Sequence, residues 1–224
     1  MNIEPLWAAP ARVQALTVVR GGELKQIPLP SAPRWLEQVH GKRVVDLDAE
    51  PGMPEADAAF TCSAGVVSAI RTADCLPVLL AAADGCVVGA AHAGWRGLAA
   101  GVLEETVAAM RARMKPGVAV VAWLGPAISA SHFEVGDEVR AAFLAYDAAA
   151  SEAFTRNERG RWQCDLFLLA RQRLNSCGVS EIAGGGMCTY ADRSRFYSHR
   201  RDVQHEGQST TGRMVTLIWL ELPE

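Results

Sequence analysis

Short apolar runs, bounded by glycine, proline and aspartate, dominate the first half of this 224-residue chain. Runs of about four to eight residues with such punctuation are typical of β-strands, because a strand ends where the backbone turns. The N-terminal half is therefore predicted to be rich in β-structure. The strands expected in it cover residues 13–19, 34–39, 43–47, 66–71, 77–82 and 86–91.

Helical spacing of apolar residues replaces these short runs after residue 94. Residues 95–114 end with basic residues and a Lys-Pro-Gly stop, which predicts one long helix. Residues 147–161 contain few large apolar side chains and are expected to form a mobile surface connection. Hairpins mixed with separate helices predict an α+β fold with mixed or antiparallel sheets. The other elements expected are a strand at 118–124, helices at 135–146 and 165–177, and strands at 179–183, 195–200 and 214–220.

Composition narrows the class of protein. Because 50% of the residues are hydrophobic, the chain can bury one sizeable core, and we expect a single domain over residues 1–224. The net charge of −3 lacks the basic excess with which proteins bind nucleic acids or anionic membranes. The most apolar window, residues 78–95, contains Asp84 and His92, which are costly in a bilayer. Since no export signal is visible either, we expect a cytoplasmic protein.

Six cysteines are spread along the chain without a Cys-x-x-Cys pair, a pattern typical of reduced thiols. The three glycines at 184–186 are expected to form a flexible connection, with a phosphate-binding nest as the alternative. Four of the cysteines are expected to fill the core, namely Cys62, Cys86, Cys164 and Cys177.

One hairpin brings a cysteine and a histidine together. The Asp-Gly pair at residues 84–85 lies between two apolar runs and predicts a tight turn. With these two residues as the turn, His92 lies opposite Pro77 and Cys75 lies opposite Gly94. Cys75 and His92 then become diagonal neighbours on one face, about 7–8 Å apart at the backbone. They could share a metal ion or a proton, or be an ordinary core thiol and core histidine.

The residues around this histidine favour a site. In "GAAHAGWRG", residues 89–97, small side chains leave space beside the imidazole, and the expected helix start offers unpaired amides to an anion. "EQVHGK" repeats the pattern of a histidine before a glycine at the end of an apolar run. On a strand, Gln38 and His40 face the same way, so both are candidate site residues.

Taken together, the motifs resemble the bacterial laccase-domain family. They are "QVHG", "RTADCLPVLL", "AAHAGWRGL", "WLGPAI", "FEVGDEV", "FYSHRRD" and "TGRMVTLIWL", between about residue 34 and residue 220. The family is also called multicopper polyphenol oxidase-like, purine nucleoside phosphorylase of the YfiH/YlmD type, and peptidoglycan editing factor. The resemblance implies a four-layer α/β/β/α architecture with mixed sheets, related to toxin cysteine hydrolases of the cytotoxic necrotizing factor type. It also implies a metal site formed by His40, Cys75 and His92, and a place near the pocket for Cys188.

One segment departs from the family pattern. Residues 203–210, "VQHEGQST", are longer than the link expected between the last two motifs, and they add His205. We interpret this segment as a loop insertion, with coordination of the metal by His205 as the alternative.

The implied ligand set suits zinc, because one thiolate and two imidazoles are borderline-soft donors and leave a fourth position open. Copper is also chemically compatible. A metal-bound water of lowered pKa can attack an electron-poor carbon such as C6 of adenine, which would deaminate adenosine.

The second reaction ascribed to the family is phosphorolysis of adenosine, inosine or methylthioadenosine, with a nucleoside and phosphate as partners. Phosphate suits a guanidinium fork. The candidate arginines are Arg71, Arg96 and either Arg200 or Arg201, with surface ion pairs as the alternative for each. Asp74 is a candidate general base or orienting group, although on a regular strand it points away from the face of Cys75.

Other functions stay open at this stage. Cys75 as nucleophile and His92 as base would make a metal-free amide hydrolase acting on a peptidoglycan (muropeptide) precursor. A dyad of this kind does not need His40. A nucleotide-sensing binding protein is a third hypothesis. A blue multicopper oxidase is excluded, since the chain has only five histidines and no His-x-His pair; polyphenol oxidation would require copper in the three-ligand site.

Overall fold

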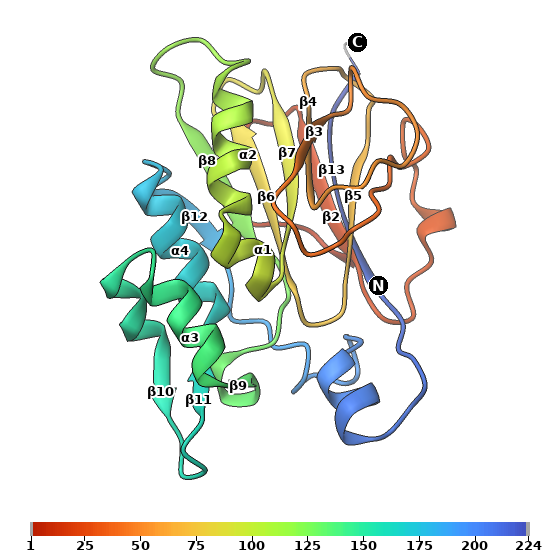
Figure 1. Ribbon diagram of the computed structural model, residues 1–224. Coiled ribbons are helices and arrows are strands. Elements are labelled where there is room, and N and C mark those ends of the chain that lie inside the picture. The colour runs from red at the N-terminus through yellow and green to blue at the C-terminus, as the bar shows by residue number, and fades with distance from the viewer. Residues whose placement is uncertain (1, 223–224) are drawn as a thin grey trace.

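The computed structural model describes residues 2–222 and contains a large mixed sheet (Figure 1). The sheet has six strands in the order β12-β8-β6-β7-β4-β3. β3 runs parallel to β4 and β12 runs parallel to β8, whereas the other neighbours are antiparallel. Its strands are Val44–Asp46 (β3), Ala58–Thr61 (β4), Leu76–Ala82 (β6), Val88–Ala93 (β7), Val120–Leu124 (β8) and Glu181–Gly184 (β12).

A four-stranded antiparallel sheet packs against one face of the large sheet. Its order is β1-β2-β13-β5. Ile70 and Ile218 from this sheet are buried against Leu79 and Val88 of the large sheet. Each fully buried side chain of this size contributes roughly 1.5–3 kcal/mol. The strands are Asn2–Ile3 (β1), Val13–Val18 (β2), Ser68–Thr72 (β5) and Met214–Leu220 (β13).

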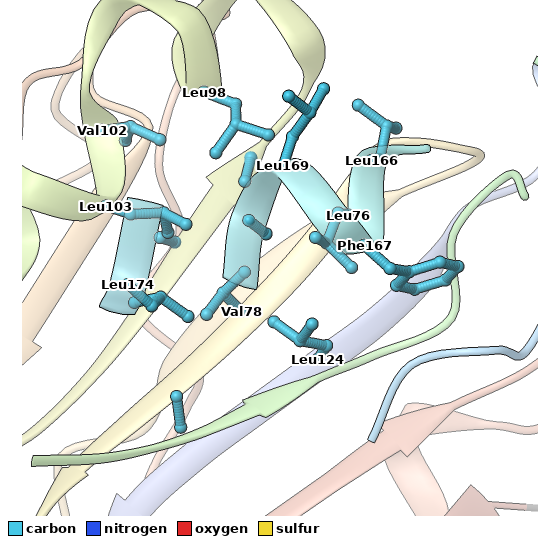
Figure 2. Close-up of a cluster of buried hydrophobic side chains, with 14 of the residues drawn as sticks. Leu76, Val78, Leu98, Val102, Leu103, Leu124, Leu166, Phe167, Leu169 and Leu174 are labelled. Atoms are coloured by element: carbon cyan, nitrogen blue, oxygen red, sulfur yellow. The ribbon is translucent and has the colours of Figure 1, made fainter. Parts of the chain in front are cut away.

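Helices cover the opposite face of the large sheet (Figure 1). Figure 2 shows leucines of these helices above the apolar side chains of β6 and β8, and all of them belong to one buried cluster. The long helix expected over 95–114 is divided at Gly101, whose φ of 99° only glycine adopts readily. The α-helices are Trp95–Ala100 (α1), Val102–Arg111 (α2), Asp137–Leu144 (α3) and Leu166–Ser176 (α4).

The prediction of a mobile connection over 147–161 is wrong. The segment forms a 3-10 helix, Ala148–Ala153, and most of a hairpin. Ala150 and Ala153 are buried, because small side chains allow the backbone to pack closely on the core, and Phe154 is buried beside Phe143. The resulting three-stranded sheet has the order β10-β11-β9. Its strands are Glu134–Val135 (β9), Phe154–Arg156 (β10) and Trp162–Cys164 (β11).

Two other predicted strands are absent within the described residues. Residues 34–39 make only isolated bridges, at Arg34 and Glu37, although Leu36 between them is buried. Residues 195–200 lead instead into a π-helical turn, Arg200–His205. The buried Arg201 guanidinium holds this turn by donating to backbone carbonyls and to Asp202. The apolar side chains of these two segments pack in the core, but the backbones of the segments do not form continuous strand pairing.

The α+β class with mixed sheets is confirmed, but the fourth layer is not an α-helical one. Residues 20–35 cover the outer face of the four-stranded sheet, with one 3-10 turn, Leu24–Gln26. Leu29 and Trp35 of this segment pack on Leu217 and Trp219 of β13. A further 3-10 turn is Ala130–His132. Among residues 2–222, no helix has both the length and the apolar character needed to cross a bilayer.

Candidate metal centre

The β6–β7 hairpin has the register that the sequence predicts. Pro77 lies opposite His92, and Leu76 lies opposite Ala93. The turn itself is wider than two residues, since Ala82 and Val87 close it by a backbone hydrogen bond. Cys75 lies directly before β6, and the same register brings it level with the residue after β7.

Three potential ligand atoms converge at this end of the hairpin. The side chains of His40, Cys75 and His92 lie with their ligand atoms all within 4.8 Å of one another. Nε2 of His40 is 3.9 Å from Sγ of Cys75. The rings of His40 and His92 meet edge to face, with centroids 4.8 Å apart. For comparison, two such donors on one tetrahedral zinc ion lie about 3.5 Å apart.

Two glycines of "AGWRG" make room for this cluster. A Cβ on Gly94 would lie 3.0 Å from Sγ of Cys75 and 3.2 Å from Cδ2 of His40. A Cβ on Gly97 would lie 2.6 Å from the carbonyl oxygen of Gly41, the residue after the histidine. The absence of side chains at these positions therefore lets the loop that carries His40 approach the hairpin.

Asp57, which the sequence reasoning missed, holds both histidines. Its side chain is fully buried, and Oδ1 lies 2.7 Å from Nδ1 of His92. The same carboxylate accepts hydrogen bonds from the backbone N–H groups of residues 39–41, at 3.2, 2.9 and 2.6 Å. These bonds hold His40 at a φ of 63°, a conformation uncommon for a residue with a side chain. An aspartate before a small apolar strand is the only sequence signal, and it is weak.

The electrostatics of this group favour a thiolate beside a charged imidazole. Burial alone raises the pKa of a thiol, but hydrogen bonds and positive charge from His40 and His92 lower the pKa of Cys75 to about 6. Burial would lower the pKa of His92, whereas Asp57 and the Cys75 sulfur raise it to about 9. Burial likewise opposes ionisation of Asp57, but hydrogen bonds from His92 and Gly41 hold its pKa below the usual range.

The cluster opens into a cavity of about 720 Å³. Apolar side chains line part of the cavity and include Trp95, Ile128, Phe133 and Leu166. Cationic groups line it as well, and two of them lie over aromatic rings, Arg96 over Trp95 and Arg200 over Phe133. Four arginines line the cavity, namely Arg71, Arg96, Arg200 and Arg213.

The predicted substrate arginines have different surroundings. Arg96 stacks over the Trp95 ring at 4.5 Å, and among residues 2–222 it makes no ion pair with a carboxylate. Arg71 lies over Trp35 and donates to the carbonyl of Leu36. Arg200 is partly buried and donates through Nη1 to a backbone carbonyl. Of the three, Arg96 is therefore the one whose guanidinium donates no hydrogen bond within residues 2–222.

Gln38 and Asp74 line the cavity but are bound within the protein. Both ends of the Gln38 amide bond the backbone of Arg71, at 2.9 Å each. The Asp74 carboxylate accepts from Thr189 and Ser198 hydroxyls and from the backbone N–H of Arg200. Asp74 itself has a φ of 89°, so the chain is not a regular strand there.

Comparison with known proteins identifies the family. A family model described as multi-copper polyphenol oxidoreductase laccase matches residues 20–221. The chain belongs to this laccase family. A similar relative, purine nucleoside phosphorylase PA4543 of Pseudomonas aeruginosa, is 43% identical over 98% of both chains. Purine nucleoside phosphorylase YfiH of Escherichia coli is 52% identical over 86% of this chain and 75% of its own.

Solved structures of similar proteins have the same fold. The Neisseria meningitidis protein NMB0706 superposes with a TM-score of 0.86, at 38% identity and over 99% of both chains. YlmD from Geobacillus stearothermophilus gives a TM-score of 0.79 at 25% identity, over 95% of this chain and 93% of its own. The mixed α+β fold is thus shared by other laccase-family proteins.

Several residues singled out in the sequence lie away from this laccase-family centre. Nδ1 of His205 lies 2.9 Å from the Tyr190 hydroxyl, and His205 does not line the large cavity. Cys188 accepts from the Ser129 hydroxyl and does not line it either, nor do the glycines at 184–186. Cys164 is buried as expected. Three other cysteines, Cys62, Cys86 and Cys177, pack against the core but are partly exposed.

Other residues of the cavity were not predicted either, among them His199, Gln204 and Arg213. His199 and Arg213 lie inside motifs used for the resemblance, in which Arg200 or Arg201 was the candidate. Gln204 belongs to residues 203–210, so this segment contributes to the cavity wall through Gln204 rather than through His205.

Proposed function

We propose that the chain is a metal-dependent purine nucleoside phosphorylase that splits adenosine, inosine and methylthioadenosine with phosphate and also deaminates adenosine. The observation that carries this proposal is the His40–Cys75–His92 group at the end of an arginine-lined cavity. Relatives that cover most of the chain bear the name purine nucleoside phosphorylase. We treat residues 1–224 as one cytoplasmic domain whose partners are a nucleoside and phosphate, without nucleic acid or membrane.

The ligand set fits a metal ion on chemical grounds. Nδ1 of His92 is engaged by Asp57, which leaves Nε2 for coordination, as is usual for metal-binding histidines. We propose zinc held by His40, Cys75 and His92, with copper as the alternative ion. When bound, such an ion lowers the pKa of a bound water and polarises an attached oxygen.

The arginines that line the cavity support binding of phosphate. Arg96 has unpaired N–H groups because its guanidinium only stacks on Trp95. Arg200 and Arg71 each keep N–H groups beyond the one that they donate to a carbonyl. We assign phosphate binding to Arg96 first, with Arg200 and Arg71 completing the charge around the anion.

The apolar part of the lining suits a purine. Trp95 and Phe133 offer aromatic surface beside Arg96 and Arg200, and Ile128 and Leu166 add apolar surface. A base held there keeps bulk water from the bond that is to be cleaved. Gln38 is proposed to bind substrate while it holds the backbone of Arg71, on β5, in place.

Asp74 is better suited to positioning than to proton transfer. Both of its oxygens already accept hydrogen bonds, from Thr189 on one side and from Ser198 and Arg200 on the other. We propose that Asp74 fixes the backbone of Arg200 against the strand that leads to Cys75.

A second candidate function rests on the order of three side chains. His92 lies between Cys75 and Asp57, the arrangement of nucleophile, base and orienting carboxylate in cysteine hydrolases. In that reaction the Cys75 thiolate attacks an amide carbonyl of a muropeptide precursor, His92 protonates the departing amine, and water cleaves the thioester. His40 has no role in it, which is why this function ranks second. Copper-dependent polyphenol oxidation ranks third.

The test is product chromatography on metal-free and zinc-loaded protein. Zinc-loaded protein is expected to convert inosine and phosphate into hypoxanthine and ribose 1-phosphate, and adenosine partly into inosine. His40→Ala should abolish both reactions, whereas Cys62→Ala, a partly exposed cysteine away from the cavity, should leave them unchanged. Full activity of metal-free protein or of His40→Ala would contradict the metal centre and would favour catalysis by Cys75 and His92. Activity on a muropeptide alone would favour amide hydrolysis.

A further inference from the structure

His199 lines the large cavity, and the proposed function leaves it without a role. The residue is exposed, and its imidazole makes no hydrogen bond or ion pair within residues 2–222. The other two imidazoles of the cavity, those of His40 and His92, belong to the metal centre. Among the described residues, His199 is therefore the imidazole of the cavity that is free to exchange a proton with a ligand.

The chain on both sides of His199 is fixed close to the metal centre. Oδ2 of Asp74 accepts a hydrogen bond from the Ser198 hydroxyl at 3.1 Å and another from the backbone N–H of Arg200 at 2.7 Å. Asp74 directly precedes Cys75, one of the proposed metal ligands. One carboxylate thus holds the residues before and after His199 beside the strand that leads from Cys75, while the imidazole itself stays unbound.

The π-helical turn Arg200–His205 begins directly after His199. Its hydrogen bonds join residues five apart, which is the spacing of His199 and Gln204, and both of these side chains line the large cavity. The guanidinium of Arg200 lies 5.3 Å from the centre of the Phe133 ring. The aromatic surface proposed for the purine is thus next to the segment that carries His199.

Phosphorolysis calls for a proton at the departing base. The C1′–N9 bond breaks with its electron pair on the purine, and a phosphate oxygen bonds to C1′. Proton transfer to a leaving group in the transition state contributes about 10²–10⁴-fold in rate. The arginines of the cavity keep their protons, and the Asp74 carboxylate already accepts hydrogen bonds at both oxygens. The groups assigned to phosphate and to positioning therefore give no proton to the base.

We propose that His199 is the general acid that protonates N7 of the purine as the C1′–N9 bond breaks. This role rests on the proposed phosphorylase function. Histidine is the side chain that gains and loses a proton near neutral pH, which suits it to this step. HPO₄²⁻ loses its proton when it forms the ester, and that proton returns to the imidazole through water. The products are a neutral purine and ribose 1-phosphate, and the imidazole regains its starting charge.

Comparison of inosine with 7-methylinosine in zinc-loaded protein tests this role. N7 of 7-methylinosine already carries a methyl group, and the base is already cationic, so it departs without a proton from the enzyme. His199→Gln keeps a polar side chain but cannot supply a proton. We expect this substitution to lower kcat for inosine about 100-fold or more and to leave kcat for 7-methylinosine nearly unchanged. Because His199 is exposed, the variant should fold normally and bind as much zinc as the unchanged protein.

Glu37→Gln is the matched control, because Glu37 is another exposed titratable residue that lines the same cavity. Any change in it should affect the two nucleosides alike. Equal loss on both nucleosides in His199→Gln, full activity of that variant on inosine, or a loss confined to inosine in Glu37→Gln would each overturn the role of His199 and leave the phosphorylase function intact. If the unchanged protein split neither nucleoside, the phosphorylase function would fail, and this role with it.

Discussion

The Asp57 carboxylate and the His92 imidazole are joined by a 2.7 Å hydrogen bond in the interior of the protein. Because the same carboxylate also accepts three backbone N–H groups around His40, one residue orients two of the three potential metal ligands. The geometry of the centre therefore depends on a side chain that touches neither a metal ion nor a substrate.

Asp57→Asn tests this dependence. The amide is the same size as the carboxylate but loses charge and cannot accept at both of its heavy atoms, so zinc affinity should fall about 10–100-fold. Competition with a chromophoric chelator measures the change. Asp46→Asn, at a solvent-facing ion pair with Arg113, is the control and should leave affinity unchanged. Unaltered zinc binding by Asp57→Asn would show that the histidines do not need this support.

Gly94→Ala tests the space beside Cys75. The added methyl group would lie 3.0 Å from the sulfur and 3.2 Å from the His40 ring, so both ligands must move. Overpacking of this kind costs about 1–3 kcal/mol, and here we expect it as lost zinc affinity, measured by the same chelator competition. Leu6→Ala, at an 89% exposed position, is the control substitution. Wild-type affinity in Gly94→Ala would contradict a crowded centre.

The ionisation of Cys75 predicts a specific pH dependence for the metal-free protein. Because the pKa of Cys75 is lowered to about 6, alkylation by iodoacetamide should rise through a midpoint near pH 6. The His92 imidazolium persists until pH rises through about 9, so the ion pair stabilises the fold between these two values. That stability is lost as pH falls through the pKa of Cys75 and as pH rises through the pKa of His92. Alkylation with the midpoint of an ordinary thiol would refute this prediction.

Phe154→Ala tests the structure found for residues 147–161. Phe154 is 7% exposed and lies with its ring 6.0 Å from that of Phe143. Removing a buried phenyl ring costs about 3–5 kcal/mol, which urea unfolding measures. A loss below about 0.5 kcal/mol, as for a surface position, would mean that the segment is a loose connection after all.

Arg96→Ala tests the proposed phosphate contact. We expect KM for phosphate to rise about tenfold or more, in keeping with loss of a charged hydrogen bond, while KM for inosine changes little. Arg113→Ala, an exposed arginine outside the cavity, should leave both constants unchanged. An equal rise in both constants would indicate that Arg96 shapes the cavity rather than binds the anion.

The local sequence signals predicted the hairpin well. The Asp-Gly turn and the two apolar runs placed His92 opposite Pro77, because strand pairing and side-chain alternation are properties of short segments. The turn is wider than the two residues predicted. The strand register is nevertheless the predicted one, since Ala82 and Val87 are hydrogen-bonded on either side of the turn.

Contacts between distant segments could not be predicted in this way. Asp57 bonds the backbone of the loop at 39–41, which lies 16 to 18 residues earlier in the chain, and nothing in the residues near Asp57 indicates those partners. Residues 147–161 have few large apolar side chains, which predicted a surface connection. The alanines in this segment instead allow it to pack closely on the core. Arg201 and Asp202 interrupt the expected strand at 195–200, because their buried side chains bond carbonyls and each other.

X-ray absorption at the zinc edge tests the central claim most directly. Protein loaded with one zinc ion per chain should show one sulfur neighbour at about 2.3 Å and nitrogen neighbours at about 2.0–2.1 Å. The sulfur neighbour should disappear in Cys75→Ser and persist in Cys188→Ser. A zinc shell without sulfur in the unchanged protein, or sulfur that persists in Cys75→Ser, would contradict a centre formed by His40, Cys75 and His92.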